Sequence, residues 1–85
     1  MNPRVTHVRP SPGHILVVTF DNGEVREFDL KPYLNRGIFA QLEVPDRFAK
    51  AAVVAGSVEW PDGQALSFDT LYLAGAPVAV GTESA

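Results

Sequence analysis

The sequence predicts an α+β fold, with a small, mostly antiparallel sheet and short helices covering one face of it. Two observations lead to this class. β-Branched residues gather in short runs between Gly, Pro, Asn and Asp, which is typical of strands joined by tight turns. The segments between these runs are too short for the crossover helices of a parallel sheet. With 85 residues, 46% hydrophobic and 20% charged, the chain has the size and composition of one globular domain.

A strand and a hairpin open the chain. Alternation over residues 5–9 indicates a strand, which we expect the Pro- and Gly-rich segment 10–13 to break. Residues 14–20 are rich in β-branched side chains and predict a second strand, which returns antiparallel through residues 25–28. The turn between them contains Gly23, which tolerates positive φ. One face of the hairpin is expected to be buried and to carry Leu16, Val18 and Phe20.

Short helical segments are expected next. Asp29 is a candidate N-cap, and Pro32 falls in the first helical turn, where its missing N–H costs nothing. Gly37 suits the left-handed position that closes this segment. The apolar spacing over residues 38–42 predicts a second segment, and residues 45–49 predict one more turn.

A second strand pair follows. Residues 51–54 form an apolar strand, Gly56 allows a sharp return, and residues 57–60 alternate as a strand should. Turn chemistry at residues 61–63 then closes this strand.

A last helical turn is expected to be capped by Ser67 or Asp69 and to end at Gly75. We therefore expect one α+β domain over residues 1–75. Residues 76–85 form a C-terminal tail that is either flexible or contributes an edge strand at residues 76–80.

Aromatic, leucine and glycine residues of these segments are candidate structural anchors. They are Phe20, Gly23, Phe28, Leu34, Gly37, Phe39, Phe48, Trp60, Gly63, Leu71 and Tyr72. Strand alternation places Trp60 on the same face as Val58 and leaves Glu59 on the opposite, solvated face. A packing role for Trp60 is therefore favoured over a role in catalysis or base stacking.

No residue pattern predicts catalytic chemistry, a cofactor or a metal. His7 and His14 flank a Pro-rich loop and could approach each other, but neither has further ligands or an orienting acid at a suitable spacing. Glu59 and Asp62 could act as an acid and base pair, yet strand alternation already explains their placement. We therefore expect a protein that is not an enzyme and that binds no cofactor.

The charges are unevenly distributed along the chain. Seven Lys and Arg residues and six acids precede residue 51, whereas four acids and no base follow it, which gives net charges of +1 and −4. No basic patch for nucleic acid is expected. An acidic C-terminal part would suit a basic protein partner.

The composition also indicates a compartment. With no cysteine, the chain has neither disulfides nor thiolate metal sites, and the cytoplasm is the expected location. The N-terminus lacks the apolar run of a signal peptide, and the longest apolar stretch, residues 51–55, is too short to span a membrane.

The spacing of a set of mostly aromatic, leucine, glycine and turn residues resembles the pattern of a known family. The relevant residues are Phe20 to Gly23, Phe28 to Leu30, Tyr33, Leu34, Gly37 to Phe39, Leu42, Phe48, Trp60 to Gly63, Leu71 and Tyr72. Over residues 4–74 this pattern resembles the small bacterial domain of unknown function family 2442. The resemblance implies a compact α+β domain without a known enzymatic activity. It also implies that members of the family occur as stand-alone proteins. Some stand next to a second small protein in a pairing suggestive of toxin and antitoxin, and others precede a helix-turn-helix domain.

These observations together suggest an interaction domain. The leading hypothesis is a non-enzymatic protein that binds a protein partner, as an antitoxin does, or that forms a homodimer. An edge strand at residues 76–80 could accept a strand from that partner. The alternative hypothesis is an accessory transcriptional regulator that binds DNA.

Overall fold

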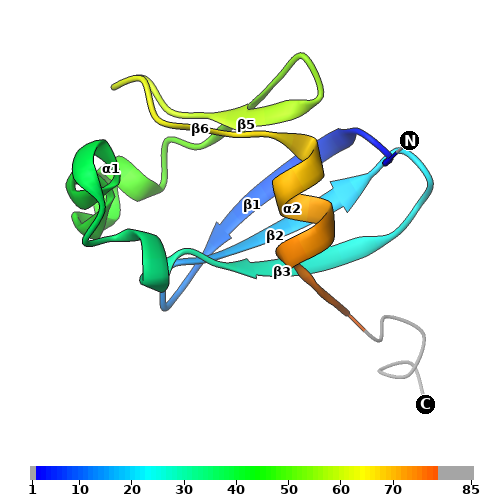
Figure 1. The fold of residues 1–85 in the computed structure, drawn as a ribbon, viewed down its shortest axis with the longest axis horizontal. Helices are drawn as coiled ribbons and strands as arrows, with labels where there is room; N and C mark the ends of the chain where they lie inside the picture. The colour runs from blue at the N-terminus through cyan, green and yellow to red at the C-terminus, as the bar shows by residue number, and fades with distance from the viewer. Residues whose placement is uncertain (1, 79–85) are drawn as a thin grey trace.

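Two antiparallel sheets share one core in the computed structural model, which describes residues 2–78 (Figure 1). The first sheet has the strand order β1-β2-β3-β7, and the second has the order β4-β5-β6. The strands are β1 Val5–Ser11, β2 Ile15–Phe20, β3 Val25–Asp29, β4 Ala52–Val54, β5 Ser57–Glu59, β6 Ala65–Leu66 and β7 Ala76–Pro77. The helices are the 3₁₀ segments η1 Lys31–Tyr33 and η2 Gly37–Glu43 and the α-helices α1 Pro45–Phe48 and α2 Phe68–Ala74. The predicted α+β class is confirmed, although the strands form two sheets rather than one.

The first hairpin differs from the prediction at its loop. β1 does not break at Pro10 but continues to Ser11, and Pro10 pairs with Leu16 of β2. Because β1 is an edge strand, a residue without an N–H can stand there without removing a ladder hydrogen bond. The chain then reverses at Gly13 and His14, whose φ values are 80° and 59°.

The second turn lies where the sequence predicts it. Gly23 has φ 90°, and its N–H donates to the carbonyl of Phe20 at 2.9 Å. The Asn22 side-chain oxygen accepts from the N–H of Glu24 at 3.0 Å, so the turn is held by side-chain and backbone bonds.

The segments between the sheets are mostly 3₁₀ rather than α-helical. Asp29 is the last residue of β3, not an N-cap, and its Oδ1 accepts from the N–H of Lys31 at 2.9 Å while Leu30 occupies the cap position. Gly37 has the expected left-handed conformation, with φ 48°, but it begins η2 instead of closing η1. Short runs between fixed strand ends favour the tighter helix.

The second sheet is built on two tight turns. Ala55 and Gly56, with φ 51° and 82°, join β4 to β5, and Gly63, with φ 103°, joins β5 to β6. The sequence analysis did not predict β6, because a strand of two residues shows no periodicity. All three residues of β4 are exposed, although the sequence of this strand is apolar.

Trp60 connects the second sheet to α1. It is 4% exposed, its Nε1 donates to the carbonyl of Phe48 at 3.0 Å, and the two rings stack with centroids 6.5 Å apart. The core contains Val5, Leu16, Val18, Phe20, Phe28, Leu30, Leu42, Phe48, Val58, Trp60, Leu66 and Leu71. Leu34, Phe39 and Tyr72 pack against this core and are partly buried.

Helix α2 is fixed to the first sheet. Ser67 is its N-cap and accepts from the N–H of Thr70 at 3.2 Å. At the other end, the Arg26 guanidinium donates to the carbonyls of Tyr72 at 2.9 Å and Gly75 at 3.2 Å. These bonds direct the chain into β7, which pairs with β3. Residues 79 and 80 of the edge strand suggested by the sequence lie outside the described residues.

Candidate protein-interaction surface

The four-stranded sheet has two different faces. Its inner face carries Leu16, Val18, Phe20 and Phe28, all of which belong to the core. Its outer face contains no fully buried residue in the described part of the chain. The outer-face residues are His7, Arg9, Ser11, Ile15, Val17, Thr19, Val25, Glu27, Asp29, Ala76 and Val78.

Strand register orders these side chains in rows. In the central row, Val17 of β2 lies between Arg9 of β1 and Glu27 of β3. The row on one side consists of His7, Thr19 and Val25, and the row on the other side consists of Ser11, Ile15 and Asp29. The middle of the outer face is therefore apolar, with bases along β1 and acids along β3.

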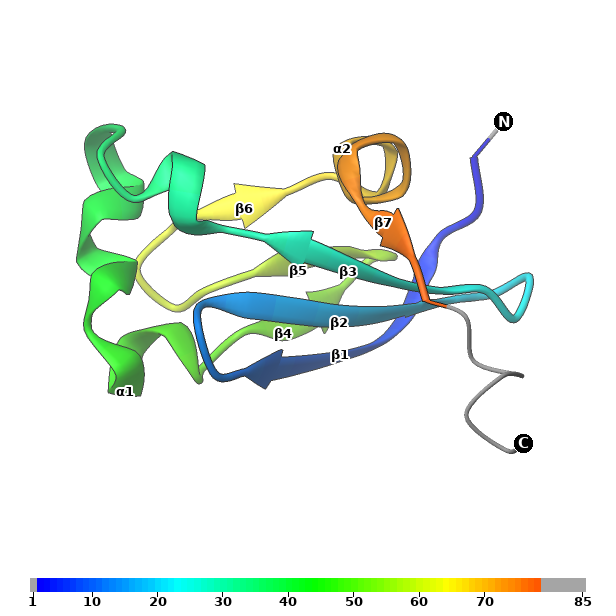
Figure 2. The same cartoon turned by 90° about the horizontal axis from the view of Figure 1, so that it is seen from below.

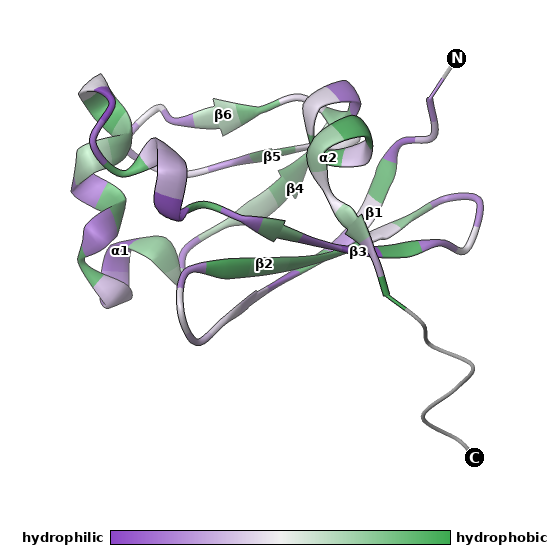
Figure 3. Ribbon diagram, turned by 60° about the horizontal axis from the view of Figure 1, so that its bottom comes forward, coloured by the Kyte–Doolittle hydropathy of each residue, from purple (hydrophilic) through white to green (hydrophobic). Residues whose placement is uncertain are grey.

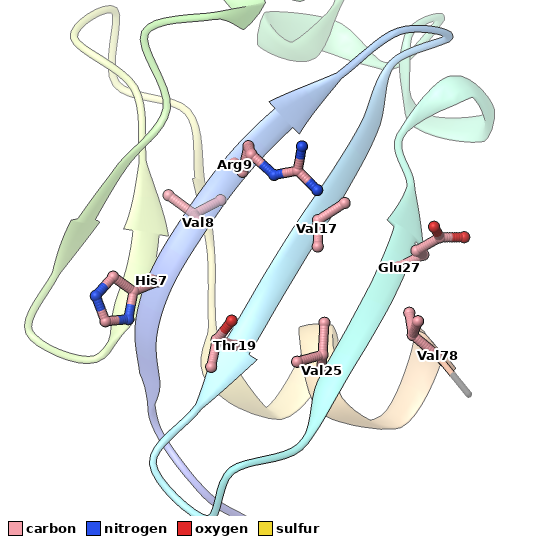
Figure 4. A pocket seen from close by; sticks show the side chains of 8 residues that line it. All are labelled: His7, Val8, Arg9, Val17, Thr19, Val25, Glu27 and Val78. Carbon is pink, nitrogen blue, oxygen red and sulfur yellow. The ribbon is translucent and has the colours of Figure 1, made fainter. Parts of the chain in front are cut away.

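The apolar centre lines a shallow hollow of about 600 Å³ on this face, shown in Figure 4. Val17, Val25 and Val78 form its apolar floor and wall, and these three side chains are half-buried. Arg9 and Glu27 rise at opposite sides. In the described structure neither side chain has an ion pair or a hydrogen-bond partner.

β2 carries Ile15 and Val17 on its outer face and core residues on its inner face, and Figure 3 shows the strand coloured as hydrophobic. Such strands are typical of sheets covered on both sides, whereas a strand facing water usually alternates apolar and polar residues. The sequence analysis assigned one face to the core and left the other unexamined. The sequence feature that indicates a second apolar face is the uninterrupted run of apolar residues at positions 15–18.

The two edges of this sheet are less suitable for binding. Pro10 stands in the edge strand β1 and Pro77 in the edge strand β7. Proline removes a donor from each edge, and β7 is only two residues long. Addition of a partner strand at residues 76–80 therefore gains no support from the described residues, and the outer face becomes the stronger candidate.

The structure does not bring the candidate catalytic residues together. His7 lies within β1, whereas His14 lies in the β1–β2 turn, where its Nε2 is 3.1 Å from the carbonyl of Glu43 and its ring packs on Phe48. On the sequence alone the two histidines could approach each other, but β1 extends up to the turn and places His7 opposite Thr19, away from His14. Glu59 is exposed and Trp60 buried, as alternation predicts.

The described acids after residue 50 do not form one face. Asp62 pairs with Arg47 of α1 at 3.1 Å, whereas Asp69 lies in α2 and accepts from Asn2 at 2.9 Å. Figure 2 shows α1 and α2 toward opposite ends of the molecule. Sequence position alone could not reveal this separation, because the chain runs the length of the second sheet between the two acids.

One polar cluster serves to hold α2. The Tyr72 hydroxyl donates to Glu24 at 2.6 Å and is the main cause that lowers the pKa of this carboxyl below its ordinary value. Hydrogen bonds from Asn22 and Arg26 act in the same direction. The Arg26 guanidinium also lies 4.0 Å from the centre of the Tyr72 ring, so the cluster joins the hairpin to α2.

On the outer face, the N–H and the ammonium of Lys31 lower the pKa of Asp29 below its ordinary value. This carboxylate accordingly remains charged at neutral pH at the end of β3.

Within residues 2–78, no group of three or more His, Asp or Glu residues is placed to hold a metal ion. None of the helices there combines the length and the apolar character needed to cross a membrane.

Residues 2–78 form a small α+β domain with two antiparallel sheets around one core, and no other described element covers the outer face of the four-stranded sheet. The family described as protein of unknown function DUF2442 matches residues 5–77. The chain belongs to this family, as the resemblance in the sequence indicated. Comparisons with curated proteins and with solved structures gave no match.

Proposed function

We propose that this chain is a non-enzymatic, cytoplasmic interaction domain that binds another protein chain through the outer face of the four-stranded sheet. The observation that carries the proposal is β2, which is apolar on both faces although only its inner face contributes to the core. Covering Ile15, Val17 and Val25 would remove their remaining apolar surface from water, at about 25 cal/mol per Å². A protein chain is the kind of partner that can cover a surface of this width.

The family resemblance favours an antitoxin-like arrangement, in which the chain binds a second small protein. Such a partner would have to place an acid opposite Arg9, a base opposite Glu27 and an apolar side chain on Val17. These requirements describe the partner by its chemistry.

The charges of the described residues favour a protein over DNA. Arg26, Lys31 and Arg47 are each paired with a carboxylate. Arg9 lies on the four-stranded sheet and Lys50 lies by the three-stranded sheet, so the two bases do not form a continuous basic stripe. A regulator that binds DNA would need such a stripe.

A pair of valine variants tests the proposed surface. Val17→Lys places a charge at the centre of the outer face, and Val54→Lys places the same charge on the exposed strand β4. Both positions point away from the core, so both variants should fold with melting temperatures close to the wild type. We expect tagged Val17→Lys to lose the protein chains that the wild type retains in purification from its own cells, and Val54→Lys to keep them. Equal retention by the two variants would contradict the proposed surface.

A further inference from the structure

We propose that the outer face binds a second copy of this chain, related by a two-fold axis that runs along β2. This inference rests on the proposed function and names the partner for that same surface. A two-fold interface uses one surface twice, so each residue must meet a favourable counterpart after the rotation.

Two of the three rows of the outer face satisfy this condition, and the third places His7 opposite Val25 and Thr19 opposite itself. A rotation of 180° about an axis along β2 keeps each row at its own level and exchanges the sides of the sheet. β1 of one copy then faces β3 of the other, and Arg9 meets Glu27 on both sides of the axis. In the next row, the hydroxyl of Ser11 meets the carboxylate of Asp29.

The residues of β2 meet themselves. Ile15 and Val17 would pack on their own counterparts, which joins two apolar centres. Packed sheets are rotated by about 30° relative to each other, and this rotation displaces residues less the closer they lie to its centre. Val17 belongs to the central row, so its row is displaced least. Arg9 and Glu27, in the same row, therefore stay close to their partners.

The alternative two-fold axis in the plane of this face is unfavourable. An axis perpendicular to the strands would place β1 on β1 and β3 on β3. Arg9 would then meet Arg9, and Glu27 would meet Glu27, and like charges directly opposed are destabilising. The charge pattern therefore selects the axis along β2.

The dimensions predict a weak dimer. The axis along β2 superposes β1, β2 and β3, whereas β7 has no counterpart beyond β1. β2 has six residues, so the overlapping face is about 20 Å long and about 14 Å wide at ordinary strand spacings. A face of this size buries less area than a stable specific interface, as in weak and transient association. We expect the dimer to dominate at chain concentrations on the order of 0.1 mM or above and to dissociate on dilution.

Charge reversal tests the proposed arrangement by sedimentation equilibrium of the full chain. Arg9→Glu and Glu27→Arg each create two like-charge contacts across the axis, so each variant alone should associate at least about tenfold more weakly than the wild type. An equal mixture of the two variants should form a heterodimer, because every contact is then between opposite charges. The double variant Arg9→Glu/Glu27→Arg should dimerise like the wild type.

Lys50→Glu is the matched control, since this exposed residue lies by the second sheet and should leave association unchanged. Circular dichroism melting of every variant verifies folding. A wild type that stays monomeric at millimolar concentration would overturn the dimer. So would single variants that associate like the wild type, or a mixture that stays monomeric. In each of these cases, Val17→Lys is compared with the wild type for a bound protein other than this chain. Loss of that protein by Val17→Lys would mean that the proposed function stands and that only the identity of the partner is wrong.

Discussion

Trp60 shows how a single residue holds several elements in this small domain. It closes β5, stacks on Phe48 of α1 and satisfies its indole N–H with the Phe48 carbonyl. Its backbone also anchors the turn to β6, because its N–H donates to the carbonyl of Gln64 at 2.9 Å and its carbonyl accepts from Gly63 at 3.0 Å. Removal of the side chain would leave a cavity between the second sheet and α1.

We therefore expect Trp60→Ala to destabilise the fold by about 3 to 5 kcal/mol, which is a large part of the stability of so small a domain. Circular dichroism during urea unfolding measures the change. Val53→Ala in the exposed strand β4 is a suitable control and should change stability by less than about 1 kcal/mol. A cooperative Trp60→Ala variant with an unchanged midpoint would contradict the packing role.

The second prediction at the residue scale concerns Glu24. Its pKa is lowered in the folded state, so its contribution to stability is fully present above the pKa of the unfolded chain and is lost as the pH falls through the folded pKa. Glu24→Gln removes this carboxylate. We expect the melting temperature of the wild type to fall more steeply than that of the variant between about pH 5 and pH 3. Parallel pH profiles would show that the carboxylate does not support the attachment of α2.

At the scale of elements, local patterns predicted the hairpin, its turn at Gly23 and a cap of α2 at Ser67 or Asp69, of which the structure shows Ser67. These features depend on residues close in sequence, where turn and capping chemistry acts. The division into two sheets, the continuation of β1 through Pro10 and the strand β6 depend on distant contacts. The sequence predicted the apolar character of β2, but only tertiary structure shows that no other element of residues 2–78 covers its outer face.

Two glycines test element packing for different reasons. Gly75 has an ordinary φ of −76°, but a Cβ there would collide with the carbonyl oxygen of Leu71 and lie 3.1 Å from Cβ of Arg26. Gly23 has open space around it but a φ of 90°. We expect Gly75→Ala to destabilise by about 1 to 3 kcal/mol through overpacking between α2 and β3, and Gly23→Ala by about 1 kcal/mol through backbone strain.

Hydrogen exchange distinguishes the two effects. Gly75→Ala should increase exchange in α2 and β7, whereas Gly23→Ala should increase it at the β2–β3 turn. If Gly75→Ala is neutral, α2 does not approach the sheet as closely as the structure shows.

At the scale of the whole molecule, one core serves two sheets, and no element within residues 2–78 covers the outer face of the first sheet. Its apolar centre and its opposed charges at Arg9 and Glu27 are the features from which we infer binding. The proline residues at the sheet edges fit the same interpretation, since they restrict pairing along the edges and leave the face as the contact surface.

The most direct test is a dilution series of the isotope-labelled wild type followed by NMR, from about 1 mM to about 20 µM, across the range where a small interface dissociates. We expect concentration-dependent amide shifts at Arg9, Val17, Thr19 and Glu27, with the spectrum of β4 unchanged. Shifts confined to β4 and β5 would contradict the assignment of the binding surface to the outer face. Spectra that do not change over this range, combined with retention of every bound protein by Val17→Lys, would contradict the outer face as an interaction surface altogether.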